Sequence, residues 1–187
     1  MFSSLKFKVI LFGFIFTFFS SFGQSYFLGL FNSSVRDALS ITHGQFGSIY
    51  ASATLCSSLL LIWVGKKIDD VNIFKFAFFV TILLSFACFF FSIVTSVFLL
   101  FIAIFLMRFS GQGMMSHTAS TTISRYFTKT RGRALSISWF GLSSAEFIMP
   151  VLMVYLLTII DWQNLWLIFS ISVLIILPIV SFLLIKN

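Results

Sequence analysis

Charged residues are scarce in this chain of 187 residues: Asp, Glu, Lys and Arg make up 9% of it, against roughly 25% in soluble domains. Acidic residues are the scarcest of these, with five in the whole chain, whereas hydrophobic residues make up 59%. Such a composition excludes an ordinary water-soluble domain and indicates a membrane protein that crosses the bilayer several times.

Cysteine and the usual catalytic motifs are also nearly absent. Cys56 and Cys88 lie inside apolar runs, with neither metal-ligand spacing nor an evident disulfide partner. His117 follows Ser116, but no carboxylate stands at a spacing that would orient its ring, and no Gly-rich phosphate loop is found. We therefore expect neither an enzyme nor a bound cofactor or metal.

Long apolar runs are what the chain has instead. Windows of about 19 residues identify six candidate spans, at residues 9–31, 44–64, 76–94, 97–118, 134–157 and 165–185. Lipid offers no hydrogen bonds to a backbone, and the runs lack the alternation of barrel strands, so each span should be an α-helix. The sequence predicts an all-α integral membrane protein, residues 1–187 forming one bundle of six transmembrane helices, with a tight hairpin at Thr95 and Ser96.

The net charge of +7 comes from basic residues between the spans, which excludes a nucleic-acid-binding patch. Those on alternate connectors are Lys6, Lys8, Lys66, Lys67, Lys75, Arg125, Lys129, Arg131, Arg133 and Lys186. The other connectors hold Arg36 alone, so both termini should be cytoplasmic in an inner or plasma membrane. A cleavable signal peptide at the N-terminus is the alternative for the first span, and it would leave the other five in the same orientation.

Two formally charged side chains fall inside spans, Arg108 in the fourth and Glu146 in the fifth. At 1.5 Å per residue, both should lie about 16–18 Å deep, near the midplane. A charge there costs at least about 2.5–3.5 kcal/mol, so it normally faces protein or a water-filled cavity and marks a pathway. Glu146 also precedes Pro150 by four residues, so its carbonyl loses a helical donor and the helix should bend. Glu146 then binds a proton or cation, or pairs with Arg108.

Helical spacing places polar residues in stripes on two spans. The stripe of the fourth span is Arg108, Gln112, Met115, Ala119 and Thr122. That of the first span is Gly13, Thr17, Ser20 and Gln24. Such stripes either pack against a neighbouring helix or line a cavity. His117 lies on the opposite face from Arg108, and a hydrogen-bonded packing role is favoured for it over proton relay.

Three segments together resemble the N-terminal six-helix half of major facilitator superfamily transporters. They are residues 65–75, GKKIDDVNIFK; residues 108–113, RFSGQG; and residues 125–135, RYFTKTRGRAL, followed by Gly141, Ala145 and Pro150. The last segment resembles the monocarboxylate and oxalate/formate porter-like branch. Asp70, Asn72 and Ile73 depart from the loop pattern, in which Gly and basic residues are usual.

The resemblance implies two inverted three-helix repeats, Arg108 facing a central cavity, and Gly65 and Asp69 in a cytoplasmic gate loop. It implies a secondary transporter that moves a small solute, an organic anion in this branch, by alternating access. We expect Arg108, Glu146, Gln24 and Gln112 to line the path, and a second six-helix half or a homodimer partner to complete it. The alternative is a non-transporting membrane fragment or a six-span assembly or scaffold subunit.

Overall fold

The computed structural model describes residues 4–185, which form helices joined by short connections and contain no strand. Six of the helical rods in this part of the chain are long and apolar enough to cross a membrane. They are α1 (Ser4–Ser20) with the 3-10 turn η1 (Ser21–Gly23); α4 (His43–Val64) with η2 (Gly65–Asp69); α5 (Ile73–Ser92); α6 (Val97–Met107), the π-helix η3 (Arg108–Met115) and α7 (Ser116–Tyr126); α8 (Arg131–Leu156); and α9 (Trp162–Ile185). The predicted all-α fold with six spans is confirmed.

The first span is not the single helix predicted over residues 9–31. α1 ends at Ser20, Gln24 is extended with a ψ of 153°, and α2 (Ser25–Leu30) and α3 (Asn32–Leu39) follow. Hydropathy stays high through residue 31, but it does not report where the backbone breaks. The fourth span runs on to Tyr126, beyond the predicted end at 118. The second span continues into η2, and otherwise the remaining spans begin and end within a few residues of the predicted bounds.

Side-chain caps explain why three of the helices begin where they do. Thr42 and Gln45 exchange backbone and side-chain hydrogen bonds in a capping box that starts α4. Asn72 accepts a hydrogen bond from the backbone of Phe74 to start α5, and Ser96 starts α6 in the same way. Ser96 also stands at the expected hairpin between the third and fourth spans.

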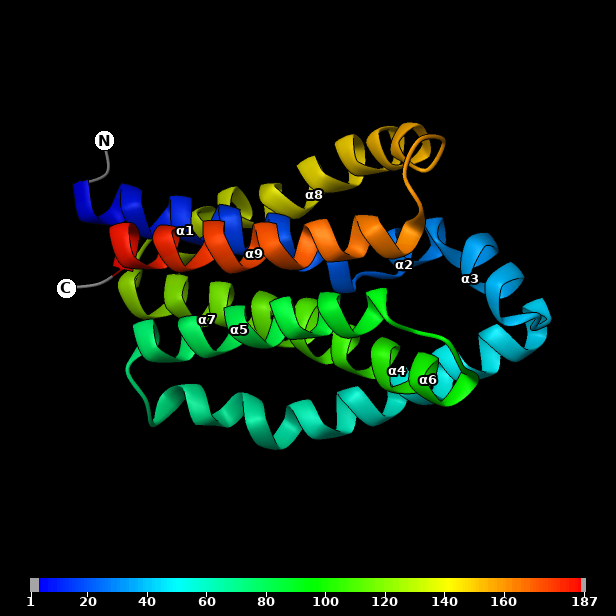
Figure 1. Ribbon diagram of the computed structural model, residues 1–187. Coiled ribbons are helices and arrows are strands. Elements are labelled where there is room, and N and C mark those ends of the chain that lie inside the picture. The colour runs from blue at the N-terminus through cyan, green and yellow to red at the C-terminus, as the bar shows by residue number, and fades with distance from the viewer. Residues whose placement is uncertain (1–3, 186–187) are drawn as a thin grey trace.

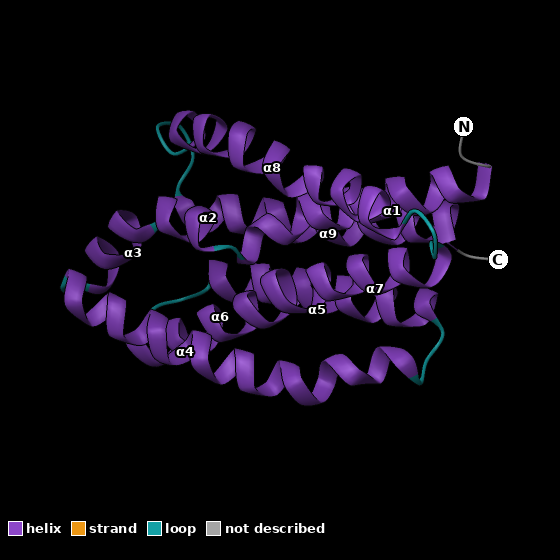
Figure 2. Cartoon of the chain, turned by 180° about the vertical axis from the view of Figure 1, so that it is seen from behind, coloured by secondary structure: helices purple, strands orange, loops and turns teal. Residues whose placement is uncertain are grey.

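The helices pack in a pattern that repeats between the two halves of the bundle. The most extensive contacts are those of α5 with α9 and of α1 with α8, and α4 packs against α6 and η3 (Figure 1, Figure 2). Exchanging spans one, two and three with spans four, five and six turns the α1–α8 contact, of spans one and five, into the contact of spans four and two, which is that of α4 with α6 and η3. The α5–α9 contact, of spans three and six, maps onto itself. This pattern is what two inverted three-helix repeats produce.

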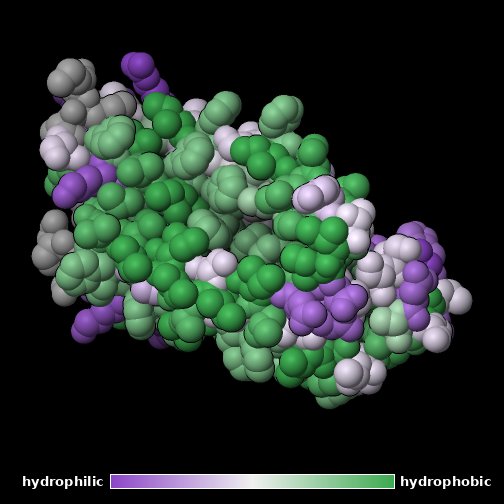
Figure 3. Space-filling view, turned by 45° about the horizontal axis from the view of Figure 1, so that its top comes forward, coloured by the Kyte–Doolittle hydropathy of each residue, from purple (hydrophilic) through white to green (hydrophobic). Residues whose placement is uncertain are grey.

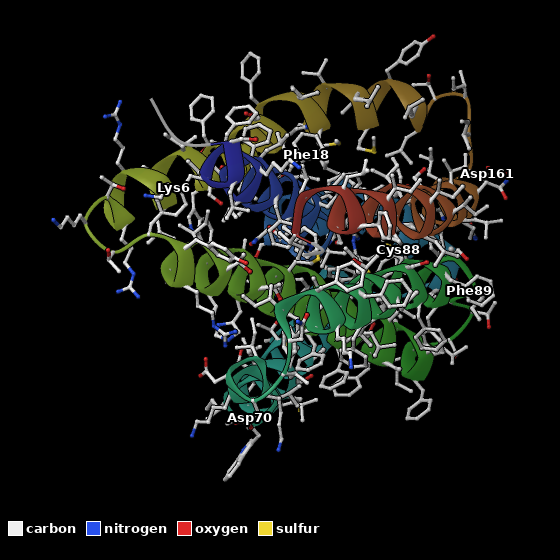
Figure 4. All side chains as sticks on the ribbon, turned by 90° about the vertical axis from the view of Figure 1, so that its left-hand side faces the viewer. Lys6, Phe18, Asp70, Cys88, Phe89 and Asp161 are labelled. Carbon is white, nitrogen blue, oxygen red and sulfur yellow. The ribbon has the colours of Figure 1, made fainter. Side chains whose placement is uncertain are left out.

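The two ends of the described chain lie at the same end of the bundle, beside the α4–α5 and α7–α8 connections (Figure 1). We call this the terminal end; the opposite end, with α3 and the α8–α9 connection, is the far end. The basic connectors predicted to share one side, which are the start of α1 and the α4–α5 and α7–α8 connections, lie at the terminal end (Figure 1), and Figure 4 views the bundle from that end. Arg36 lies on α3 at the far end, and Lys186 is outside the described residues.

A broad apolar surface separates these two polar ends (Figure 3). The spans contribute unequally to it, because α4 and α8 are the least enclosed by other helices. Within the most apolar stretch of each, only 11% of the residues of α4 and 22% of those of α8 are buried. The remaining spans bury between 33% and 50%. α4 and α8, which lie along opposite edges of the bundle in Figure 1, are therefore the spans with the most uncovered surface.

Candidate functional site

The break in the first span lies against the π-helix of the fourth. Gly23 and Gly111 face each other there: a Cβ on Gly111 would come within 2.6 Å of the Gly23 nitrogen, and one on Gly23 would collide with the backbone of Met107 and Gln112. Only glycine lets two backbones approach so closely. Two irregular segments thus meet inside the bundle, where backbone groups freed from regular helices are available to side chains.

Arg108 takes up one of these freed groups. Its Nη1 donates to the Gly23 carbonyl at 3.0 Å and to the Ser25 hydroxyl at 3.2 Å. The guanidinium also lies over the ring of Tyr50, 5.4 Å from the centroid. Arg108 is only 7% exposed, and its buried Nε has no hydrogen-bond partner among the described residues. The expectation that Arg108 faces protein or a cavity is confirmed, and one of its donors is left unused.

A cavity of about 240 Å³ lies beside Arg108. Its lining comes from α4 and η3: Ser57, Ser58, Leu61, Arg108, Gln112 and Gly113. The guanidinium of Arg108 is the one charged side chain in this lining, and the serine hydroxyls and the Gln112 amide are neutral. The local charge is therefore positive. The volume is below the roughly 300–1,000 Å³ of drug-sized ligand pockets, so the site fits a small solute.

The structure brings Gln112 to Arg108 but divides the stripe predicted for the fourth span. Gln112 lines the cavity, whereas Met115, Ala119 and Thr122 are fully buried against other helices. The predicted stripe assumed 3.6 residues per turn throughout, and the π-helix η3 winds more loosely and shifts the phase. The cavity-lining face of this span therefore ends with Gln112 and Gly113.

Gln24 and Glu146 lie elsewhere. Gln24 follows Gly23, whose carbonyl Arg108 binds, but it is extended and does not continue the stripe of the first span. Glu146 is exposed on α8 and forms no ion pair with Arg108, so that predicted pairing is wrong. α8 remains helical through Pro150.

Two other polar features of the spans have packing roles. Thr17 donates to the Ser138 carbonyl of α8 at 2.6 Å, and a Cβ on Gly13 would collide with the Ser138 side chain. Gly13 and Thr17 of the first-span stripe therefore pack against α8, whereas the Ser20 hydroxyl bonds the Thr17 carbonyl of its own helix. His117 hydrogen-bonds the Gly65 carbonyl at 2.9 Å, apart from the cavity, as its expected packing role requires.

The connection after α4 is tied to the end of α7. Arg125 donates to the Ile68 carbonyl at 2.7 Å and pairs with Asp69 at 3.0 Å, the only ion pair found among residues 4–185. Asp69 is 74% exposed, so the pair is well solvated and contributes little stability. With the His117 contact to Gly65, it links the predicted gate loop to the span that holds Arg108.

Comparison with known proteins identifies the family. The family model described as Major Facilitator Superfamily matches residues 13–187, nearly the whole chain. The chain belongs to the major facilitator superfamily. No curated protein and no solved structure matches it. As a member of this family, the chain is a multi-pass membrane protein of a transporter type, built as a six-helix major facilitator half.

Sequence reasoning missed several residues around Arg108 in this major facilitator protein: Ser25 and Tyr50 at its guanidinium, and Ser57 and Ser58 in the cavity. The two cavity serines belong to a run of small and hydroxyl residues in the second span, which is a usable signal. Ser25 and Tyr50 gave none, because they reach Arg108 only through the break at Gln24 and the side-chain contact of α2 with α4.

Proposed function

We propose that this chain is the N-terminal half of a secondary transporter, in which Arg108 binds the carboxylate of a small organic anion. One observation supports this most: a guanidinium at mid-depth has a buried, unpartnered Nε beside a small polar cavity. A carboxylate bridging Nε and the neighbouring Nη would satisfy this donor with two charge-assisted hydrogen bonds. The resemblance of residues 125–150 to the monocarboxylate and oxalate/formate branch points to the same class of solute.

A second six-helix unit is proposed to cover α4 and α8. The uncovered part of α4 presents small residues at Gly44, Gly47, Ser48, Ala51 and Ser52, which permit close helix packing. Glu146 is exposed within a span, where a carboxylate needs a polar neighbour. We propose that the unit is the other half of the transporter or a second copy of this chain, and that movement of the two units alternates access to the cavity, coupled to an ion as symport or antiport.

The positions of the basic connectors support the proposed orientation. They lie at the terminal end, so this end is proposed to face the cytoplasm, in an inner or plasma membrane. Gly65 and Asp69 would then lie in the cytoplasmic gate loop, held by His117 and Arg125. A scaffold subunit is the second candidate, favoured by the packing role of Thr17, but it does not account for the unused donor of Arg108.

Uptake by the complete transporter, reconstituted in liposomes, tests the role of Arg108. Arg108→Ala should lower uptake of labelled small carboxylates about 100-fold, since charge-assisted hydrogen bonds contribute about 1.5–3 kcal/mol each and 1.4 kcal/mol is tenfold. Arg108→Lys should lose most of the activity as well, because an ammonium cannot bind a carboxylate bidentately.

Lys129→Ala is the matched control, because Lys129 is an exposed cation in the connection between α7 and α8, away from the cavity. Its uptake should equal that of the parent. Full uptake by Arg108→Ala, at equal protein in the liposomes, would refute the proposed role.

A further inference from the structure

Two hollows lie along α4 on either side of the Arg108 guanidinium. The inner one is the cavity described above. The outer one, of about 220 Å³, lies toward the far end and is lined by Ser25, Gly29, Asn32, His43, Phe46, Gly47 and Tyr50. Tyr50 of the outer hollow and Ser57 of the inner one are about two helical turns apart on α4, or about 10 Å.

Three side chains stand between the hollows. The Tyr50 hydroxyl donates to the Ser25 hydroxyl oxygen at 2.9 Å, and Arg108 donates to the same oxygen at 3.2 Å. The Tyr50 ring also lies against the guanidinium. Ser25 and Tyr50 line the outer hollow and Arg108 lines the inner one, so this cluster is the wall that the two hollows share.

We propose that the two hollows are successive parts of one solute path, and that Ser25 and Tyr50 close it over Arg108. This inference rests on the proposed transport function and assigns Ser25 and Tyr50 as positioning residues. In the closed arrangement they hold the guanidinium between α2 and α4. An anion arriving from the far end competes with the Tyr50 ring and the Ser25 hydroxyl for the same cation.

The backbone around Ser25 suits such a movement. Ser25 begins α2 directly after the extended Gln24, and α2 is only six residues long. The break lets α2 shift without unwinding α1, because the few residues between two helices absorb the change in φ and ψ. Tyr50, in contrast, is fixed on the long helix α4 and stacks against Phe46 with ring centroids 6.3 Å apart.

Thiol accessibility tests the closure without requiring transport. The probe position is Ser57→Cys, because Ser57 lines the inner cavity and is 4% exposed. The exposed Cys56 is replaced by Ser, and Cys88 is buried and stays. An anionic, membrane-impermeant methanethiosulfonate is added to sealed vesicles of the full chain, in the preparation whose outer face exposes the far end. Ser48→Cys, at the far end of α4, identifies that preparation.

We expect the thiol at position 57 to react slowly when Tyr50 is present and at least tenfold faster in the Tyr50→Ala background. Tyr50→Phe, which keeps the ring and removes the bond to Ser25, should give a smaller increase of several-fold. Tyr155→Phe is the matched control, since Tyr155 is exposed on α8, and it should leave the rate unchanged. The closure would be overturned if the thiol at position 57 reacted at the same rate in the parent, Tyr50→Ala, Tyr50→Phe and Tyr155→Phe backgrounds while the thiol at position 48 reacted normally.

The uptake assay separates failure of this closure from failure of the proposed function. If the closure is correct, Tyr50→Phe should change the KM for the anion or its far-end access, while Arg108→Ala abolishes uptake. If Arg108→Ala abolishes uptake but position 57 is equally accessible with and without Tyr50, transport stands and the closure does not. If accessibility depends on Tyr50 but Arg108→Ala transports normally, the closure stands and the anion-binding role of Arg108 does not.

Discussion

The closest backbone approach in the site depends on two hydrogen atoms, those that Gly23 and Gly111 have in place of side chains. A Cβ at Gly111 would lie 2.6 Å from the Gly23 nitrogen, which belongs to the backbone and has no flexible atom to yield. Gly111→Ala must therefore separate η1 from η3. We expect a loss of stability of about 1–3 kcal/mol, the usual cost of overpacking.

Thermal unfolding of the purified chain in detergent, followed by size-exclusion chromatography after heating, measures this loss. Gly132→Ala is the matched control, because nothing lies within 4 Å of a Cβ built there. It should melt with the parent or slightly above it, as expected for Ala replacing Gly in a helix. If Gly111→Ala melted together with Gly132→Ala, the close contact would be refuted.

For single residues, the sequence predicts the depth in the membrane and the chemical type of the side chain. A guanidinium inside an apolar run has to be buried in protein or solvated, so Arg108 was identifiable before its partners were known. Those partners were not predictable, since Ser25 and Tyr50 come from elements whose crossing no local spacing encodes. The same limit applies to Glu146, whose predicted depth was similar but whose side chain is exposed on α8 and forms no ion pair with Arg108.

At the scale of elements, α5 and α9 are joined by a reciprocal serine contact. Ser85 donates to the Ser170 carbonyl at 2.9 Å and Ser170 donates to the Ser85 carbonyl at 2.8 Å. In a double-mutant cycle, Ser85→Ala and Ser170→Ala should couple by about 0.6 kcal/mol, and by no more than about 1.7, the range found for interhelical hydrogen bonds in membranes. Unfolding in detergent by a denaturing surfactant measures each free energy.

Ser172→Ala is the control for this pair, because the Ser172 hydroxyl bonds Ile168 of its own helix. Its effect should add to that of Ser85→Ala without coupling. A Ser85–Ser170 coupling no larger than the control value would show that the two bonds do not hold α5 to α9.

The spans themselves were predictable as elements, but their irregularities were not. Hydropathy is a sum over a window, so it locates α5, α8 and α9 within a few residues. It is equally high across a regular helix and across the break at Gln24. Likewise, no composition signal marks the π-helix η3, whose hydrogen bonds reach one residue further than those of an α-helix and which packs chiefly against η1 and α4.

On the scale of the whole molecule, the distribution of basic residues predicts a topology that labelling can check. Thiols introduced at Lys66 and Arg131, beside the α4–α5 and α7–α8 connections at the terminal end, should react from one face of the membrane. A thiol at Asp161, in the α8–α9 connection at the far end, should react from the other (Figure 1). The reason is that all three positions are exposed, Lys66 and Arg131 at the very ends of their spans and Asp161 between two spans. Labelling from both faces of sealed vesicles, in the Cys56→Ser background, measures this; reaction of positions 66 and 131 from opposite faces would contradict the fold.

The sequence by itself determined that this protein lies in a lipid bilayer, that its spans are helices, how many spans there are, and at which end of the bundle its basic residues gather. These follow from local quantities, because burial in lipid forces the backbone to bond within each segment and basic side chains stay at the surface. Only the tertiary structure decided which polar groups meet. Segments far apart in the sequence pack together at the break after Gly23, at the π-helix of Arg108 and at the Ser25–Tyr50 contact. The energy of such packing depends on both segments, so it cannot be read from the residues of one span.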